Sequence, residues 1–142
     1  MTEDTRGMLD AACHCGAVQF RLRLSDGVNS ARRCDCSLCR MRGAVVVSAR
    51  VGEIVFLRGE DNLSLYQFNT KVARHYFCKT CGIYTHHQRR SDPGQFGVNV
   101  ACIAGMSPFD FAEVLVMNGV VHPLDGDGGH RVAGVLRFSK QA

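Results

Sequence analysis

The stretch CHCGAVQFRLRLS, residues 13–25, joins a close pair of cysteines to an alternating run of apolar and polar residues. Apolar residues occupy positions 18, 20, 22 and 24, and polar residues follow each of them. Side chains of a strand point alternately to its two faces, so this period of two predicts a half-buried β-strand. The same geometry lets Cys13 and Cys15 point to one side and bind one metal ion at a strand end.

Short apolar and β-branched runs predict further strands along most of the chain. These runs are AVVVSA at 44–49, EIVFLRG at 53–59, LSLYQF at 63–68 and FGVNVAC at 96–102. Turn-forming residues fill 25–31, 88–95 and 125–130. After Ser107 and Pro108 we expect at most one helical turn, followed by a hairpin at Asn118-Gly119. The pattern therefore predicts an all-β protein.

The composition is that of a globular domain with an excess of cysteine. The 142 residues are 46% hydrophobic and 21% charged, which suits a single domain with a buried core. Residues 1–12 hold no apolar stretch typical of a secretion signal. Apolar runs such as AVVV at 44–47 are too short to cross a bilayer. We expect a cytoplasmic protein without a membrane partner, whose eight cysteines bind metal or act in catalysis.

The charge pattern fits a small anionic ligand at least as well as a nucleic acid. The net charge is +4, from 17 Lys and Arg against 13 Asp and Glu. The basic residues are scattered, and no run of five or more like charges forms a nucleic-acid-binding arm. A solvated basic surface without a specific partner explains the same balance.

Seven of the eight cysteines form three tight clusters, which indicates metal binding. Two pairs complete a tetrahedral shell typical of a structural zinc site, with the ligands Cys13, Cys15, Cys78 and Cys81. The middle cluster leaves one position open on a second zinc, with the ligands Cys34, Cys36 and Cys39. We therefore expect two Zn²⁺ ions per chain. Spacing alone also permits other divisions, for example Cys13 and Cys15 with Cys34 and Cys36.

Other chemistries compete for these cysteines. A thioredoxin-like redox pair is disfavoured because neither Cys-x-x-Cys is expected to open a helix in a βαβ pattern. Disulfides between the clusters and an iron–sulfur cluster are further alternatives. Cys102 shares a face with apolar residues, which predicts a buried thiol, with a fourth ligand for the second site as the alternative.

Three histidines lie close to a predicted strand. His75, His86 and His87 are expected to be surface residues, and the alternative is a role in proton transfer or in supporting the metal ligands.

An ordered set of motifs resembles the glutathione-dependent formaldehyde-activating enzyme family, which includes the centromere protein V group. The motifs are CHCGAVQF, RCDCSLCR, GEDNLSLYQF, RHYFCKTCG, GVNVACI and NGVVHPLD, and they span residues 11–125. The resemblance implies a β-tent of antiparallel sheets, a structural zinc on the first and third clusters, and a second zinc on the middle cluster near a thiol substrate. The chain departs from the family at Ile83 and the double histidine, and residues 126–142 match no family motif.

The resemblance also implies a carbon-sulfur lyase activity, in which formaldehyde and the thiol of glutathione join reversibly to give S-hydroxymethylglutathione. Three thiolates give a zinc site a net charge of −1, so nearby cations are needed to attract an anionic thiol. Arg33, Arg40 and Arg42 are the candidates for this role and for binding glutathione carboxylates. The sequence identifies no general acid or base.

A different class of function fits the same cysteines. A zinc-stabilised module that binds a protein or nucleic acid would use both metals structurally, although no basic stripe with interleaved aromatic residues supports it. A thiol or zinc sensor is a third hypothesis. All three hypotheses share one expected organisation of the chain. We expect a tail at residues 1–10, a zinc-binding domain at 11–125 and an extension at 126–142 that adds a strand.

Overall fold

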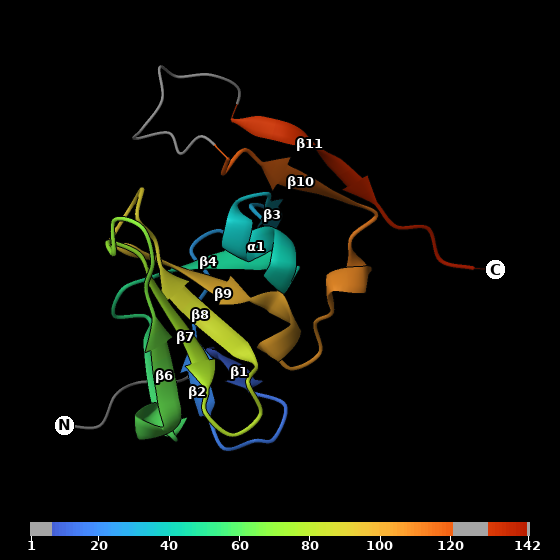
Figure 1. Ribbon diagram of the computed structural model, residues 1–142. Coiled ribbons are helices and arrows are strands. Elements are labelled where there is room, and N and C mark those ends of the chain that lie inside the picture. The colour runs from blue at the N-terminus through green and yellow to red at the C-terminus, as the bar shows by residue number, and fades with distance from the viewer. Residues whose placement is uncertain (1–6, 121–130, 142) are drawn as a thin grey trace.

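The computed structural model describes residues 7–120 and 131–141, and these residues form two β-sheets (Figure 1). The smaller sheet has the order β1-β2-β5, with β1 at Leu9–Ala12, β2 at Gln19–Leu22 and β5 at Ile54–Arg58. The larger sheet has the order β11-β10-β3-β4-β9-β8-β7-β6. Its strands are β3 Arg32–Cys34, β4 Val46–Arg50, β6 Leu63–Tyr66, β7 Arg74–Cys78, β8 Tyr84–Gln88, β9 Gln95–Asn99, β10 Glu113–Met117 and β11 Val132–Arg137. The helical elements described are α1 Ser37–Arg42 and the 3₁₀ turns η1 Glu60–Asn62, η2 Val100–Cys102 and η3 Pro108–Asp110.

Antiparallel pairing dominates both sheets, which confirms the predicted all-β class and the antiparallel sheets of a β-tent. One pair departs from this pattern, because β3 and β10 run parallel with Cys34 opposite Met117. The chain between residues 35 and 112 supplies the long connection that a parallel pair requires. The pairing brings the end of β10 to the middle cysteine cluster.

The alternating stretch forms β2 and supplies the centre of the core. Val18, Phe20 and Leu22 have no exposed surface, whereas Gln19 and Arg21 between them are partly exposed. The Phe20 ring lies 5.5 Å from the ring of Phe56 on β5. Burial of a side chain of this size contributes about 2–3 kcal/mol. The predicted half-buried strand is therefore confirmed.

The two faces of the larger sheet have different neighbours. Val47, Val98 and His86 are paired neighbours on β4, β9 and β8 and lie in the core. Side chains one position further along each strand point the other way, so Ser48 and His87 line a cavity. The sheet thus separates the core from the candidate site.

Several sequence-based expectations change at the ends of strands. The run FGVNVAC forms β9 only up to Asn99, after which the Asn99 side chain accepts a hydrogen bond from the backbone of Ala101 and starts η2. The capping box at Ser107 starts η3, which confirms the single helical turn. The prediction of a tight hairpin at Asn118-Gly119 is wrong. The strand β10 pairs instead with β11, and the Gly119 N–H donates to Asp35 Oδ1.

Beyond residue 125 the structure adds β11 to the edge of the larger sheet. The predicted turn at 125–130 lies outside the described residues, and the division of the chain into tail, domain and extension stays a prediction. Turns form at 25–31 and 88–95 as expected. Among the described residues, no helix has the length and apolar character needed to cross a membrane. The cytoplasmic location remains a prediction.

His86 lies inside the core and not at the surface, which corrects the sequence-based expectation. Its side chain packs among four aromatic rings at centroid distances of 4.8–6.1 Å, those of Phe20, Phe56, Tyr76 and Phe96. This burial lowers the pKa of His86 from 6.5 to about 4. The folded protein therefore holds the ring neutral in the pH range where the unfolded chain binds a proton.

The buried His86 predicts a loss of stability in mild acid. Because its folded pKa is depressed, its contribution is complete above pH 6.5 and is lost as the pH falls toward 4. Between pH 7 and pH 5 the free energy of unfolding should fall by about 2 kcal/mol from this group alone. Urea unfolding of the protein and of His86→Phe at both pH values measures the difference. Equal pH dependence of the two proteins would contradict this account.

Candidate functional site

The first cysteine group lies where two distant strands end. Cys13 follows β1, Cys78 closes β7, and the four sulfur atoms of Cys13, Cys15, Cys78 and Cys81 lie within 4.8 Å of one another. Backbone N–H groups of Val18 and Thr80 donate to the sulfurs of Cys13 and Cys78, both at 3.3 Å. Such donors stabilise the thiolate form that a metal ligand requires.

The spacing of these sulfur atoms fits zinc. Two sulfurs bound tetrahedrally to one zinc at about 2.3 Å lie about 3.8 Å apart. The sulfur of Cys15 lies 3.7 Å from that of Cys13 and 3.8 Å from that of Cys78. Four sulfur donors in this arrangement could hold a zinc ion, and the group is closed because it supplies all four corners.

The second group is built by the junction of β3 and α1. It contains Cys34, Cys36 and Cys39, and no fourth metal-binding side chain joins it among the described residues. Cys36 is the N-cap of α1, and its sulfur accepts from the Cys39 N–H at 3.3 Å. Hydrogen bonds from the other two thiols lower the pKa of Cys36, so one thiolate persists in the group. Three sulfur donors with an open corner could hold a metal ion that also meets a ligand.

The helix at this site was missed by the sequence analysis. Cys36-x-x-Cys39 opens a helix, which the predicted all-β pattern did not include. However, β3 and β4 on either side of α1 pair antiparallel, so the unit is not the βαβ crossover of a thioredoxin-like protein. The helix α1 has only six residues and none of them is buried, so it lacks the long apolar pattern by which a helix is predicted.

The segment after β10 closes over the second group. The Asp35 N–H donates to the Met117 carbonyl at 3.1 Å, and the Gly119 N–H donates to Asp35 Oδ1 at 2.7 Å. A Cβ atom on Gly119 would lie 2.3 Å from the Cys34 sulfur and 2.7 Å from the Cys36 Cβ. Only glycine fits here, because the backbone itself packs on the cysteines.

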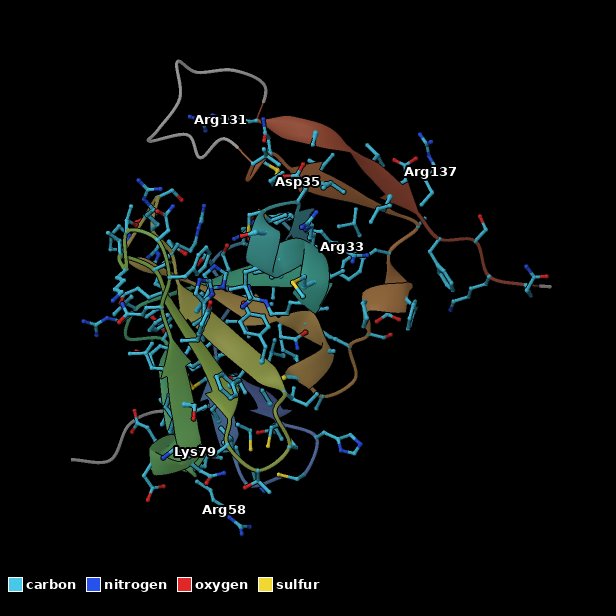
Figure 2. The ribbon with its side chains drawn as sticks, in the orientation of Figure 1. Arg33, Asp35, Arg58, Lys79, Arg131 and Arg137 are labelled. Carbon is cyan, nitrogen blue, oxygen red and sulfur yellow. The ribbon has the colours of Figure 1, made fainter. Side chains whose placement is uncertain are left out.

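A cavity of about 880 Å³ opens beside the second group and not beside the first. Its floor is the outer face of the larger sheet, and α1 and the residues around β10 form its walls. Asp35 and Arg131, both labelled in Figure 2, line it. The arginines that line it among the described residues are Arg32, Arg33, Arg40, Arg42, Arg89, Arg90 and Arg131. The cavity is therefore strongly cationic and suits an anionic ligand.

Arg42 connects the cysteines to the sheet. Its guanidinium donates to the Cys39 sulfur at 3.4 Å and contacts His75 Nδ1 at 3.2 Å. It also lies over the Tyr84 ring, 3.6 Å from the centroid. A guanidinium that contacts a thiol, an imidazole and an aromatic face is held in one orientation, so Arg42 fixes the position of Cys39.

His75 and His87 are cavity residues and not ordinary surface residues. The two rings stack at 5.0 Å, and Tyr84 Oη lies 2.6 Å from His87 Nδ1. Burial lowers the pKa of His75 to about 4, so its ring is neutral at pH 7. Because Arg42 can only donate, His75 Nδ1 accepts and its Nε2 carries the hydrogen.

The His87 ring packs against the neighbouring strand β9 at Gly97, a position without a side chain. A Cβ at Gly97 would lie 2.4 Å from His87 Cε1, so only glycine leaves room for the ring. No local sequence pattern indicates this pairing of glycine and histidine.

Cys102 is separate from both groups. It is buried, as expected, and its thiol donates to the Tyr84 carbonyl at 3.6 Å. Burial raises the pKa of Cys102 to about 12, which keeps it a neutral thiol.

Comparison with known proteins agrees with the motifs. Residues 8–114 match the family described as glutathione-dependent formaldehyde-activating enzyme. A protein of Halomonas elongata named as a candidate glutathione-dependent formaldehyde-activating enzyme is 30% identical over 82 residues, which cover 52% of each chain. The present chain thus spans about half the length of that relative.

A solved structure shares the fold over most of the chain. The crystal structure of a Rhodobacter sphaeroides protein, from Northeast Structural Genomics, is 53% identical with a TM-score of 0.75, and covers 77% of this chain and 100% of its own. The family match extends over more than half of the present sequence and contains all seven clustered cysteines. The chain belongs to the glutathione-dependent formaldehyde-activating enzyme family.

Proposed function

We propose that the protein catalyses the reversible addition of a glutathione-type thiol to formaldehyde, a carbon-sulfur lyase reaction, at the cavity beside Cys34, Cys36 and Cys39. The observation that carries the proposal is the contrast between the two cysteine groups. One group supplies four sulfurs and does not line the cationic cavity of about 880 Å³, whereas the other supplies three sulfurs and lines it. Family membership supports the same reaction.

We assign zinc to both groups, with the four-cysteine ion structural and the three-cysteine ion at the substrate site. When bound by Cys34, Cys36 and Cys39, zinc supplies Lewis acidity, which favours the thiolate form of a nearby thiol. The ligand set fits this role because it supplies three sulfur donors, one fewer than a closed zinc site, and all three cysteines line the cavity.

The side chains around the cysteines stabilise charge, attract the substrate and donate a hydrogen bond. In the forward direction the thiol sulfur forms a bond to the formaldehyde carbon, the carbon–oxygen π bond breaks, and the thiol proton ends on that oxygen. Arg42 stabilises negative charge on the cysteine ligands, and the other arginines attract the anionic substrate. His75 is neutral and carries its hydrogen on Nε2, so it is the donor that we assign to the developing oxyanion.

The test is the rate of exchange between formaldehyde and glutathione, measured by NMR exchange spectroscopy. The uncatalysed reaction proceeds as well, so the rate and not the final composition is decisive. We expect zinc-loaded protein to accelerate exchange and Cys36→Ser to abolish the acceleration. If the zinc-loaded protein leaves the rate unchanged, the enzymatic proposal fails and a zinc-stabilised binding module becomes the better reading.

Replacement of Arg42 should reduce this activity strongly. A buried hydrogen bond to a charged group is worth about 1.5–3 kcal/mol, so Arg42→Gln should slow exchange by about 10- to 100-fold. Arg42→Lys should recover only part of the rate, because lysine cannot contact Cys39 and His75 together. The control is Arg58→Gln, which removes an exposed arginine remote from Arg131 (Figure 2). An unchanged rate in Arg42→Gln would refute the assigned role.

A further inference from the structure

The strand β11 forms an open edge of the larger sheet. It lies on the outside of the molecule, and in the described part of the chain β10 is the strand that pairs with it (Figure 1). This pairing is regular from Gly134 to Arg137. The strand also lies beyond residues 8–114, which match the family. Its outer edge therefore presents a row of backbone groups to which a further strand can bind.

The hydrogen bonds to β10 show which backbone groups face outward. The Phe138 N–H donates to the Ala112 carbonyl at 2.9 Å, so the backbone of Phe138 faces β10. Residues of an antiparallel pair alternate between bonded and non-bonded positions, which turns the backbone of Leu136 toward β10 as well. The N–H and C=O groups of Val135 and Arg137 therefore point away from β10, toward the open edge.

Both faces of this edge carry exposed apolar side chains. On one face, Leu136 is 47% exposed and lines a pocket of about 300 Å³ with Phe109 and Phe138, whose rings lie 5.2 Å apart. On the other face, Val135 lies opposite Leu115, and both side chains are exposed. Proteins usually protect an edge strand with charges, proline or a covering segment. The apolar side chains here indicate instead a surface that another strand covers.

The charges of the edge favour an uncharged partner strand. Arg137 is the charged residue between positions 134 and 138, and its Nε donates to Glu113 Oε1 at 2.8 Å. A strongly acidic or basic partner therefore gains little from this part of the strand. A second copy of β11 fits better. When a two-fold axis passes at Leu136, Val135 of each copy lies opposite Arg137 of the other, and no like charges lie opposite each other.

We propose that β11 is a homodimer interface, in which two copies of the chain pair their β11 edges antiparallel around a two-fold axis at Leu136. Such a contact uses the same surface on both copies and joins the two larger sheets into one. Main-chain hydrogen bonds along the edge supply affinity, and the alternating apolar side chains supply specificity. The dimer also holds the ribbon of β10 and β11, which forms one wall of the cavity. Dimerisation does not depend on the proposed reaction.

The test changes the residue on the proposed axis. Leu136→Glu places two carboxylates opposite each other, and Leu136→Lys places two ammonium groups there. Sedimentation velocity over a concentration series should show a dimer for the parent protein. Each variant alone should dissociate about tenfold or more readily, because it loses apolar burial and gains repulsion. An equimolar mixture of the two variants should restore a dimer with one copy of each, identified by native mass spectrometry.

The matched control is Leu65→Glu, which changes an exposed leucine on β6 at the opposite edge of the same sheet and should leave the dimer intact. If a Leu136 variant fails to fold by circular dichroism, Val135 provides a second test. Val135→Lys lies opposite Arg137 and should weaken the dimer, whereas Val135→Glu should retain it.

The opposite results would overturn the interface. A parent protein that stays monomeric throughout the concentration series rejects it, and so does parent-like dimerisation of each Leu136 variant alone. A mixture of Leu136→Glu and Leu136→Lys that stays monomeric rejects the axis at Leu136. Loss of the dimer in Leu65→Glu, with the dimer retained in the Leu136 variants, would place the contact on β6 and reject the one on β11.

Discussion

Gly119→Ala should release the metal of the three-cysteine group and abolish thiol–formaldehyde exchange while the fold survives. The added Cβ would lie 2.3 Å from the Cys34 sulfur and 2.7 Å from the Cys36 Cβ, far inside contact distance. The cysteines or the segment after β10 must therefore move, and the hydrogen bond from Gly119 to Asp35 would be lost with them. Because this segment lies outside the core, the loss should be local.

The measurement is zinc content per chain together with the melting temperature. We expect Gly119→Ala to lose one of two ions and to shift the melting temperature by only a few degrees. Such a shift corresponds to a change of about 1 kcal/mol in the free energy of unfolding. Gly134→Ala is the matched control, because a Cβ at Gly134 on β11 meets no atom within 4 Å. Retention of both ions by Gly119→Ala would show that the close packing on Cys34 does not position the group.

Cys81→Ser should unfold the protein, whereas Cys39→Ser should leave the fold intact. The four-cysteine group joins the segment after β1 to the end of β7, so zinc there connects both sheets. Structural zinc contributes about 10 kcal/mol or more in small domains, comparable to the whole stability of a domain. We expect Cys81→Ser to unfold the protein by circular dichroism, and Cys39→Ser to remain folded with one ion fewer.

Cys102→Ser serves as the control for both substitutions. It also removes one thiol, but from a buried position outside the two groups. It should retain two ions and activity, at a cost of about 1 kcal/mol for the altered core position. Equal unfolding of Cys81→Ser and Cys39→Ser would contradict the division into a structural and a substrate site.

The extent to which sequence predicted this structure depends on how local each feature is. The alternation through Phe20 and Leu22 identified β2, and the spacing of cysteines identified the three clusters. Both patterns depend on neighbours in sequence, whereas the division of the clusters into groups of four and three was only one of those that the spacing permits. By contrast, the bond between Asp35 and Gly119 joins positions 84 residues apart, and the contact of Arg42 with His75 joins positions 33 residues apart. No local pattern contains such pairs.

The histidines illustrate the same limit. Polar residues are usually exposed, so a surface position was the reasonable expectation for His86 and His87. The register of β8 against β9 instead places His86 beside Val98 in the core and His87 over Gly97 in the cavity. Their burial follows from the pairing of strands, which no local sequence pattern reveals.

The rate of zinc transfer to a chelator that changes colour on binding tests the central claim most directly. The account predicts two ions per chain released in two phases, a fast one from the group that lines the cavity and a slow one that coincides with unfolding. It also predicts that Cys39→Ser and Gly119→Ala each lose the fast phase alone. A single ion per chain, or two ions released together at one rate, would contradict the division of the seven cysteines into a closed site and an open one.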